Sequence, residues 1–161
     1  MIRVGLGQDS HIFSVVEKNK PLILGGVHID AKGGFKANSD GDVVLHSICN
    51  ALSSAIGGDS LSIWTDKMYK QGIKDSSCYV GHILNKITAL KYSVVNVSIS
   101  VEAKKPYLKT EIINQMRKKI ASLLKIKPDQ VGLTFTSGEN LTAFGQGQGM
   151  QALTVVSIAQ I

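Results

Sequence analysis

The sequence is poor in cysteine and in long apolar runs, which excludes several classes of protein. Its 161 residues include two cysteines, Cys49 and Cys78, which match no disulfide or metal-binding pattern and are typical of a reducing compartment. No apolar run approaches the ~20 residues that a membrane helix requires. Arg3, Gln8 and Asp9 interrupt the N-terminal segment, which therefore lacks the layout of a signal peptide. We expect a cytoplasmic protein with no membrane partner.

Aromatic residues are also scarce, at 6% of the chain, and none is interleaved with the densest basic run, Arg117-Lys118-Lys119. Single-stranded nucleic-acid sites usually combine basic residues with stacking aromatics, so this run indicates a solvated helix face. The formal net charge of +6 comes from scattered lysines. We therefore expect no nucleic-acid partner, whereas a basic protein suits an anionic small-molecule substrate.

No linker, internal repeat or low-complexity segment divides the chain, so we expect residues 1–161 to form one domain. Alternating apolar residues predict strands at 1–7, 94–101, 131–136 and 152–158, and a Gly-Gly break predicts a hairpin at 21–29. Helical periodicity predicts helices at about 41–57, at about 75–87 and after Pro106, with an irregular loop at 59–72. The expected fold is α/β (α+β), with a mixed or antiparallel sheet and helices packed on one face.

The stretch from Asn38 to His46 has the features of a helix start, because a Ser-Asp-Gly-Asp turn precedes an apolar run. His46 lies one turn into this helix. Asp9 and His11 are two residues apart and share a face if the strand continues to them. Together the three residues offer two imidazoles and one carboxylate, the ligand set of a catalytic zinc site. A turn acid and a surface histidine remain the commoner explanation of such spacing.

A second candidate is Glu139, in the sequence Thr136-Ser137-Gly138-Glu139-Asn140 after a predicted strand. Hydroxyls and backbone N–H groups at a strand end can hold a phosphate, and a neighbouring carboxylate can hold Mg²⁺ or Mn²⁺. A capping box for a short turn explains the same residues equally well. The glycine-rich segment 145–149 lacks the lysine of a phosphate-binding loop, so we interpret it as a tight turn or close chain packing. His28 and His82 have no acidic neighbours at suggestive spacing and are interpreted as structural or surface residues.

Taken in order, the motifs resemble the 2-C-methyl-D-erythritol 2,4-cyclodiphosphate synthase family over essentially the whole chain. The motifs that carry the resemblance are Gly7-Gln8-Asp9-Ser10-His11, Gly25-Gly26-Val27-His28-Ile29, Ser39-Asp40-Gly41-Asp42-Val43 with Leu45-His46, Gly58-Asp59, Asp75-Ser76, Ala103 with Pro106, and residues 139–149. The resemblance implies a metal-dependent, cyclising phosphorus–oxygen lyase of the non-mevalonate isoprenoid pathway. Such an enzyme converts 4-diphosphocytidyl-2-C-methyl-D-erythritol 2-phosphate to the 2,4-cyclodiphosphate and releases CMP.

The resemblance also implies site residues and an assembly. Asp9, His11 and His46 would bind one Zn²⁺ per active site, Glu139 would hold Mg²⁺ or Mn²⁺, and Ser39 would contact phosphate. The family forms homotrimers with sites between subunits, so one chain should not form a complete site. The implied substrate-binding positions are Asn38, Ser39, Asp59, Ser60, Leu61, Trp64, Ala103, Lys104, Lys105, Pro106, Tyr107, Leu108, Thr136, Ser137, Gly138, Ala143 and Gln146.

Several positions depart from the family pattern at the edges of these sites. Asn38 replaces the usual histidine, Tyr107 replaces a lysine, and Asn140 replaces a second lysine. Gln146 and Gln148 replace an arginine and a glutamate, which argues against an isoprenoid diphosphate site on the trimer axis. Both metal-ligand sets are intact. Two alternatives remain: a zinc-dependent phosphohydrolase on the same scaffold, and a catalytically impaired homologue acting as a zinc-bound trimeric binding or assembly protein.

Overall fold

The fold is built on a four-stranded mixed sheet with the strand order β1-β6-β4-β5. A computed structural model describes residues 1–16, 19–29 and 33–161 of the chain. The strands are β1 (Ile2–Ile12), β4 (Tyr92–Glu102), β5 (Val131–Thr136) and β6 (Gly149–Gln160). β4 and β5 pair in parallel, whereas β6 is antiparallel to both β1 and β4. A separate hairpin joins β2 (Leu22–Leu24) to β3 (Val27–Ile29), as the Gly-Gly break predicts. The mixed sheet is confirmed.

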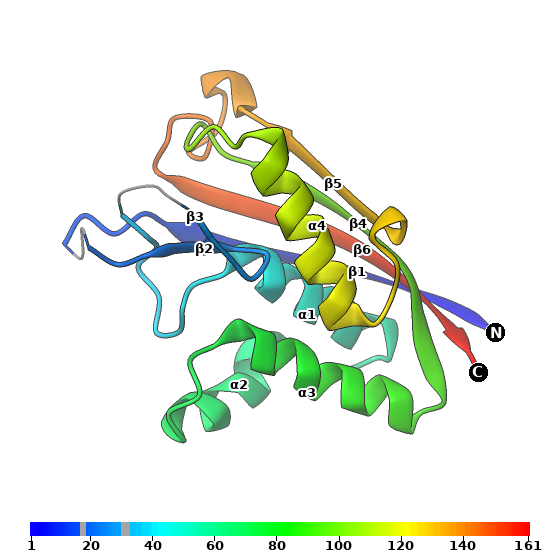
Figure 1. Cartoon of the computed structure of the whole chain (residues 1–161). Coiled ribbons are helices and arrows are strands. Elements are labelled where there is room, and N and C mark those ends of the chain that lie inside the picture. Colours follow the sequence, from blue (N-terminus) through cyan, green and yellow to red (C-terminus); the bar gives the residue numbers. More distant parts are fainter. Residues whose placement is uncertain (17–18, 30–32) are drawn as a thin grey trace.

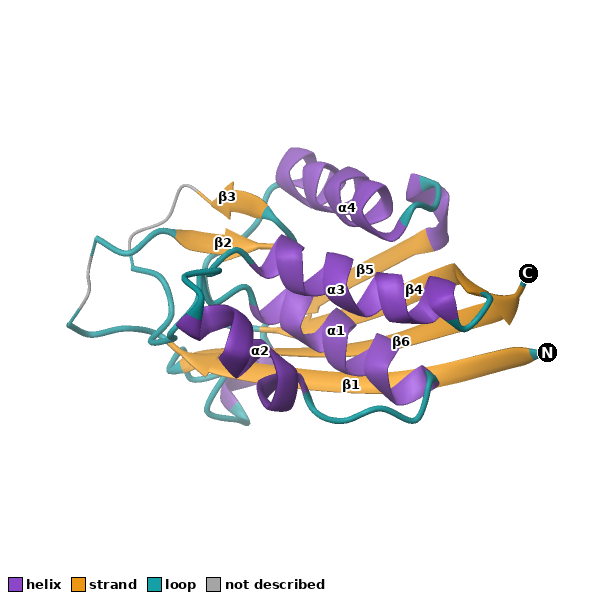
Figure 2. Ribbon diagram, turned by 90° about the horizontal axis from the view of Figure 1, so that it is seen from below, coloured by secondary structure: helices purple, strands orange, loops and turns teal. Residues whose placement is uncertain are grey.

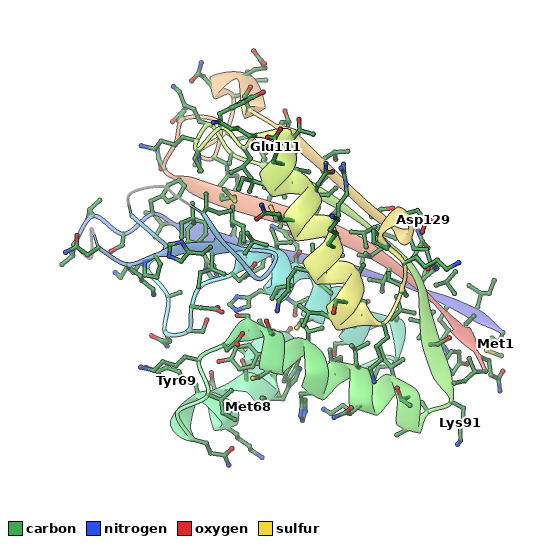
Figure 3. All side chains as sticks on the ribbon, in the orientation of Figure 1. Met1, Met68, Tyr69, Lys91, Glu111 and Asp129 are labelled. Atoms are coloured by element: carbon green, nitrogen blue, oxygen red, sulfur yellow. The ribbon has the colours of Figure 1, made fainter. Side chains whose placement is uncertain are left out.

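The helices cover one face of this sheet, as expected (Figures 1 and 2). They are α1 (Val43–Ala55), α2 (Leu61–Lys70), α3 (Ser76–Ala89) and α4 (Thr110–Leu124). Side chains fill the layer between α1, α3, α4 and the sheet (Figure 3), and this layer holds the apolar core. Within the described ranges, no helix combines the length and the apolar character needed to cross a membrane.

The irregular loop predicted for residues 59–72 is wrong, because most of that segment is helix α2. Leu61, Trp64 and Met68 have the i, i+3, i+7 spacing of one helix face and pack against the core. Only three apolar residues repeat at this spacing, so the sequence pattern indicated a helix only weakly. The start of the helix also gives little warning, since the Ser60 side chain makes no capping hydrogen bond.

Helix α1 lies directly on the backbone of β1 because Gly5 and Gly7 have no side chain. A Cβ built on Gly7 would lie 2.2 Å from both the Ser47 carbonyl oxygen and the Ala51 backbone nitrogen. A Cβ on Gly5 would lie 2.0 Å from the Ala51 carbonyl oxygen. No side chain fits at such distances, so the two glycines set how closely the helix approaches the strand. The strand itself continues to Ile12, five residues beyond the predicted end.

Asp42 caps α1 and also fastens the β2–β3 hairpin to it. The buried carboxylate accepts hydrogen bonds from the backbone N–H groups of Val44 and Leu45, at 3.1 and 3.0 Å. It accepts two more from Gly25 and Gly26 in the hairpin turn, at 2.9 and 2.6 Å. Burial raises the pKa of Asp42 to about 6, although the N–H donors counteract part of that shift. The predicted cap is confirmed, with a second role in tertiary structure.

No described helix covers the other face of the sheet (Figure 2), and this face carries exposed apolar side chains. Soluble monomers rarely expose apolar side chains side by side on a sheet, and such a surface commonly serves protein association. The exposed apolar residues of β1, β4 and β6 are Ile2, Val4, Leu6, Ile12, Val95, Leu153 and Val155. Leu6 and Val155 lie directly opposite one another across the β1–β6 pair.

Candidate active site

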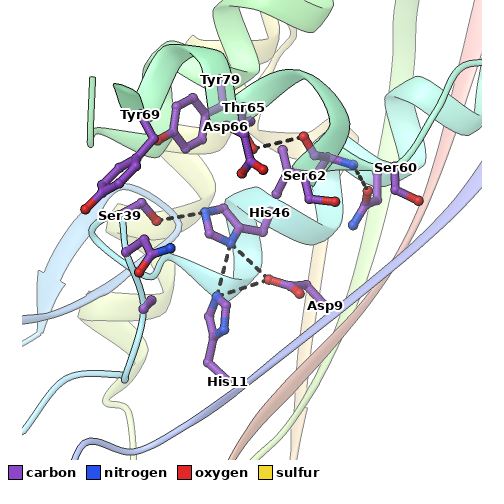
Figure 4. Close-up of a pocket in the computed structure, with 14 residues that line it drawn as sticks. Asp9, His11, Ser39, His46, Ser60, Ser62, Thr65, Asp66, Tyr69 and Tyr79 are labelled. Atoms are coloured by element: carbon purple, nitrogen blue, oxygen red, sulfur yellow. Dashed lines mark hydrogen bonds and ion pairs between the residues drawn. The ribbon is translucent and has the colours of Figure 1, made fainter. Parts of the chain in front are cut away.

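Three predicted metal ligands converge beside the C-terminal half of β1 (Figure 4). Asp9 and His11 project from the strand toward α1, and His46 projects from the first turn of that helix. His46 Nδ1 lies 3.0 Å from Asp9 Oδ2 and 3.1 Å from His11 Nε2. His11 Nε2 lies 3.2 Å from the same Asp9 oxygen. The strand periodicity therefore places Asp9 and His11 on one face, as the sequence suggests.

These donor atoms suit a divalent metal ion. Burial by itself raises the pKa of Asp9, but hydrogen bonds and charges from His11 and His46 outweigh it and hold that pKa well below its ordinary value. The carboxylate is therefore ionised at neutral pH. Ligand atoms around a tetrahedral Zn²⁺ are about 3.3 Å apart, as follows from metal–ligand distances of 2.0–2.2 Å. The observed separations of 3.0 to 3.2 Å fit this arrangement with little movement.

The cluster opens into a cleft of about 320 Å³ between β1, α1 and α2. Its lining includes the predicted residues Asp9, His11, Asn38, Ser39, His46, Ser60 and Leu61. Ser39 Oγ lies 3.4 Å from His46 Nε2 at the mouth of the cluster (Figure 4). Two other predicted residues do not line this cleft. The Asp59 side chain is exposed outside it, and Trp64 stacks on His82 with ring centroids 5.0 Å apart.

The remaining predicted residues gather around the C-terminal ends of β4 and β5. The Ala103 N–H donates to the Thr136 carbonyl at 3.0 Å, and Lys104 Nζ donates to Asn140 Oδ1 at 2.8 Å. Ser137 caps a 3-10 helix over Gly138–Asn140, in which the Glu139 side chain is exposed. This second group consists of Ala103, Lys104, Lys105, Pro106, Tyr107, Leu108, Thr136, Ser137, Gly138, Glu139, Ala143 and Gln146. Leu108 is the one member with a buried side chain, at 8% exposure, and it packs in the core.

The three candidate metal ligands and Glu139 lie at opposite edges of the sheet, whereas Ala143 of the second group lines a small pocket together with His11. Asp9 and His11 are on the edge strand β1, whereas Glu139 follows the edge strand β5. Three strand spacings of about 4.8 Å separate those edges by about 14 Å. Among the described residues, none of the second group lines the cleft of the metal cluster. A single chain thus brings together the three candidate metal ligands but leaves Glu139 at the other edge of the sheet.

Comparison with known proteins assigns the chain to a family. The sequence model of the YgbB family matches residues 2–159. The chain belongs to this family. A 2-C-methyl-D-erythritol 2,4-cyclodiphosphate synthase of Chlamydia trachomatis serovar L2b is 44% identical over 159 residues, which cover 98% of this chain and 88% of the relative. The resemblance drawn from the sequence motifs is confirmed.

Solved structures agree with the fold of this YgbB family member. IspF of Plasmodium falciparum, in complex with CDP, matches with a TM-score of 0.84 and 26% identity over 99% of this chain and 96% of that one. Bifunctional IspDF of Campylobacter jejuni matches with a TM-score of 0.87 and 30% identity, over 100% of this chain and 43% of that longer one. The single-domain, mixed-sheet architecture is therefore that of the family.

The sequence did not predict several residues that line the cleft of this YgbB family member. The additional lining residues are Ala37, Asn50, Ser62, Thr65, Asp66, Tyr69 and Tyr79. Four of them lie on α2, which was interpreted as a loop and so gave no basis for predicting which side chains face inward. Asn50 had a usable signal, because it lies one helical turn after His46. Its amide nitrogen donates to the Gln8 carbonyl at 3.0 Å, and its Oδ1 accepts from the Leu61 N–H at 2.9 Å.

The glycine-rich segment forms a tight turn with close packing, as we interpreted it. A Cβ on Gly149 would lie 2.2 Å from the His11 carbonyl oxygen, and one on Gly145 would lie 2.6 Å from the Gly138 carbonyl oxygen. Gln146 and Gln148 project from this turn as exposed neutral amides, and Gln148 Nε2 lies 3.4 Å from Gln146 Oε1. The segment supports the loop that carries Glu139.

Proposed function

We propose that this chain is a 2-C-methyl-D-erythritol 2,4-cyclodiphosphate synthase. The reaction converts 4-diphosphocytidyl-2-C-methyl-D-erythritol 2-phosphate to the cyclic diphosphate and releases CMP. The observation that carries the proposal is the cluster of Asp9, His11 and His46 at the mouth of a cleft, in a chain that shares 44% identity with a relative of that name. Two imidazoles and one ionised carboxylate leave a fourth position open, which is typical of a catalytic zinc site.

Two metal ions would take part, each held by a different group of residues. Asp9, His11 and His46 would hold Zn²⁺, and the exposed carboxylate of Glu139 would hold Mg²⁺ or Mn²⁺. The metal ions would neutralise phosphate charge and polarise the attacked phosphorus. Glu139 has a left-handed backbone with φ of 49°, and its exposed carboxylate accepts a hydrogen bond from the Ser137 hydroxyl at 3.1 Å.

The protein groups mainly align the reacting phosphates. The substrate 2-phosphate attacks the β-phosphorus in line, the bond from that phosphorus to the α-phosphate oxygen breaks, and CMP leaves. Such a displacement needs positioning and charge neutralisation more than covalent chemistry. The Ser39 hydroxyl and the Asn38 amide line the cleft beside His46 and can donate hydrogen bonds to a phosphate. Lys104 and Lys105 are both exposed, and Lys104 donates to Asn140, the residue next to Glu139, so its ammonium can supply positive charge at the diphosphate.

The assembly we propose is a homotrimer in which each site joins two protomers. Two features support it: the uncovered apolar face on β1, β4 and β6, and the separation of the zinc ligands from Glu139 within one chain. Association through the apolar face would remove that surface from water. It would also bring the β1 edge of one protomer toward the β5 edge of its neighbour, where the second group would form the cytidine pocket.

Phosphorus NMR of the purified protein with the cytidyl substrate, Zn²⁺ and Mg²⁺ tests the proposal. We expect the appearance of CMP together with a cyclic diphosphate that contains no terminal phosphate. A matched sample treated with a chelator should show no turnover, because both sites would lose their metal.

The alternatives give different spectra. CMP with an open-chain product carrying a terminal phosphate would indicate a phosphohydrolase. Bound zinc without any turnover would indicate a binding or assembly protein, with the neutral Asn38 as the first residue to restore to histidine.

A further inference from the structure

The far side of the His46 ring contacts a buried residue that the proposed reaction does not use. His46 Nδ1 faces the metal cluster, 3.0 Å from Asp9 Oδ2. His46 Nε2, on the opposite side of the ring, lies 2.8 Å from the hydroxyl oxygen of Ser76. Ser76 is the first residue of α3 and is 0% exposed. The imidazole of His46 therefore lies between Asp9 on β1 and Ser76 on α3, two elements that are far apart in sequence.

The direction of the Ser76 hydrogen bond follows from its second partner. The Ser76 hydroxyl also contacts Asp40 Oδ1, and the Ser76 backbone N–H donates to Asp40 Oδ2 at 2.9 Å. Asp40 Oδ1 accepts a further N–H from Asp42 at 3.1 Å. A carboxylate that accepts from three donors has no proton to give, so the single Ser76 hydroxyl proton points to Asp40. The Ser76 oxygen can then only accept from His46.

This direction determines which nitrogen of His46 carries the proton. A neutral imidazole has one N–H, and the acceptor at Ser76 places it on Nε2. In this tautomer Nδ1 carries a lone pair, which it can give to a metal ion held between His46, Asp9 and His11. Ser39 Oγ also lies near Nε2, but its distance of 3.4 Å makes it the weaker contact.

We propose that Ser76 and Asp40 are positioning residues that hold His46 in the tautomer able to bind a metal through Nδ1. The inference rests on the metal site of the proposed function and extends it to two residues outside the cleft. Outer partners of this kind orient a ligand ring and typically change metal affinity 10–100-fold when removed. The sequence could not indicate this role, because the contact between Ser76 and His46 depends on how α3 packs against α1.

Nitrogen-15 NMR of the zinc-loaded protein measures directly which nitrogen of His46 carries the proton. We expect the His46 signals of the wild-type protein to show a proton on Nε2 and none on Nδ1. In zinc-loaded Ser76→Ala the acceptor is gone, and we expect the Nε2–H signal of His46 to shift and to broaden through faster proton exchange with solvent. Wild-type His46 protonated on Nδ1 would overturn the proposal.

Zinc affinity, measured by competition with a coloured chelator, gives a second readout. We expect Ser76→Ala to bind Zn²⁺ about 10–100-fold more weakly than the wild type. The control is Ser77→Ala, the same substitution one residue along α3, where the side chain does not contact His46; its affinity should equal that of the wild type. Equal affinities of Ser76→Ala and the wild type would contradict the positioning role.

The two readouts separate this inference from the proposed function. A wild-type protein that binds no zinc would refute the metal site and with it the affinity argument. Zinc binding with an unchanged Ser76→Ala affinity would leave the synthase proposal intact and refute only the role of Ser76.

Discussion

Replacing His11 by alanine should abolish zinc binding and lower the rate of CMP release by at least about 10³-fold. Metal ions contribute several kcal/mol of transition-state stabilisation in such reactions, and each 1.36 kcal/mol corresponds to a factor of ten. His11 supplies one of three donor atoms that lie within 4.8 Å of one another, so its loss leaves two ligands. Metal analysis of the purified protein and single-turnover measurement of CMP release check the two effects separately.

The control for His11→Ala is His28→Ala on β3. His28 is exposed and does not line the cleft, so zinc content and turnover should both equal those of the wild type. Circular dichroism should show both variants folded, because the His11 side chain is part of a surface cleft and is 18% exposed. Wild-type zinc content and turnover in His11→Ala would show that the cluster is not the metal site.

Replacing Gly7 by alanine should lower the free energy of unfolding by about 3 kcal/mol or more, the upper end of the usual cost of overpacking. The new methyl group would meet backbone atoms of α1 at 2.2 Å on two sides. Backbone atoms inside a helix cannot rotate away as a side chain can, so helix and strand must separate. Denaturant unfolding at a fixed protein concentration measures the change.

The same variant should weaken zinc binding, because moving α1 away from β1 moves His46 away from Asp9 and His11. The matched control is Gly132→Ala on β5, where the nearest atom to a new Cβ is 3.5 Å away. Alanine favours a strand over glycine by roughly 0.5–1 kcal/mol, so the control should be unchanged or slightly more stable. Equal unfolding midpoints for the two variants would show that the close contact between β1 and α1 is not tightly packed.

The sequence predicts the parts of the fold whose causes are local. The start of α1 was predictable because the Asp42 cap and the following apolar run are adjacent in the chain. The hairpin was predictable because Gly25 and Gly26 adopt left-handed conformations between two short strands. Helix α2 was not predictable, because Leu61, Trp64 and Met68 stabilise it by packing against the core rather than through caps or propensity.

In the candidate site, too, the features with local causes were predictable and those that depend on tertiary packing were not. Asp9 and His11 were predictable as a pair because a strand places alternate residues on one face. Their meeting with His46 depends on Gly5 and Gly7, which let α1 approach β1, and no local pattern reveals that distance. Glu139 could be predicted as a ligand by resemblance, yet its position at the far edge of the sheet follows from the strand order alone.

The separation of His11 and Glu139 has a consequence for mixtures of defective chains. If each site takes its zinc ligands from one protomer and Glu139 from the next, a His11→Ala chain and a Glu139→Ala chain are inactive alone but complement each other. In every trimer that contains both variants, one of the three sites takes its zinc ligands from a Glu139→Ala chain and its Glu139 from a His11→Ala chain, so that site is intact. Random assembly of equal amounts of the two chains should therefore restore roughly a quarter of wild-type turnover. Co-expression of the two variants measures this, and no recovery would place both residues in the site of a single protomer.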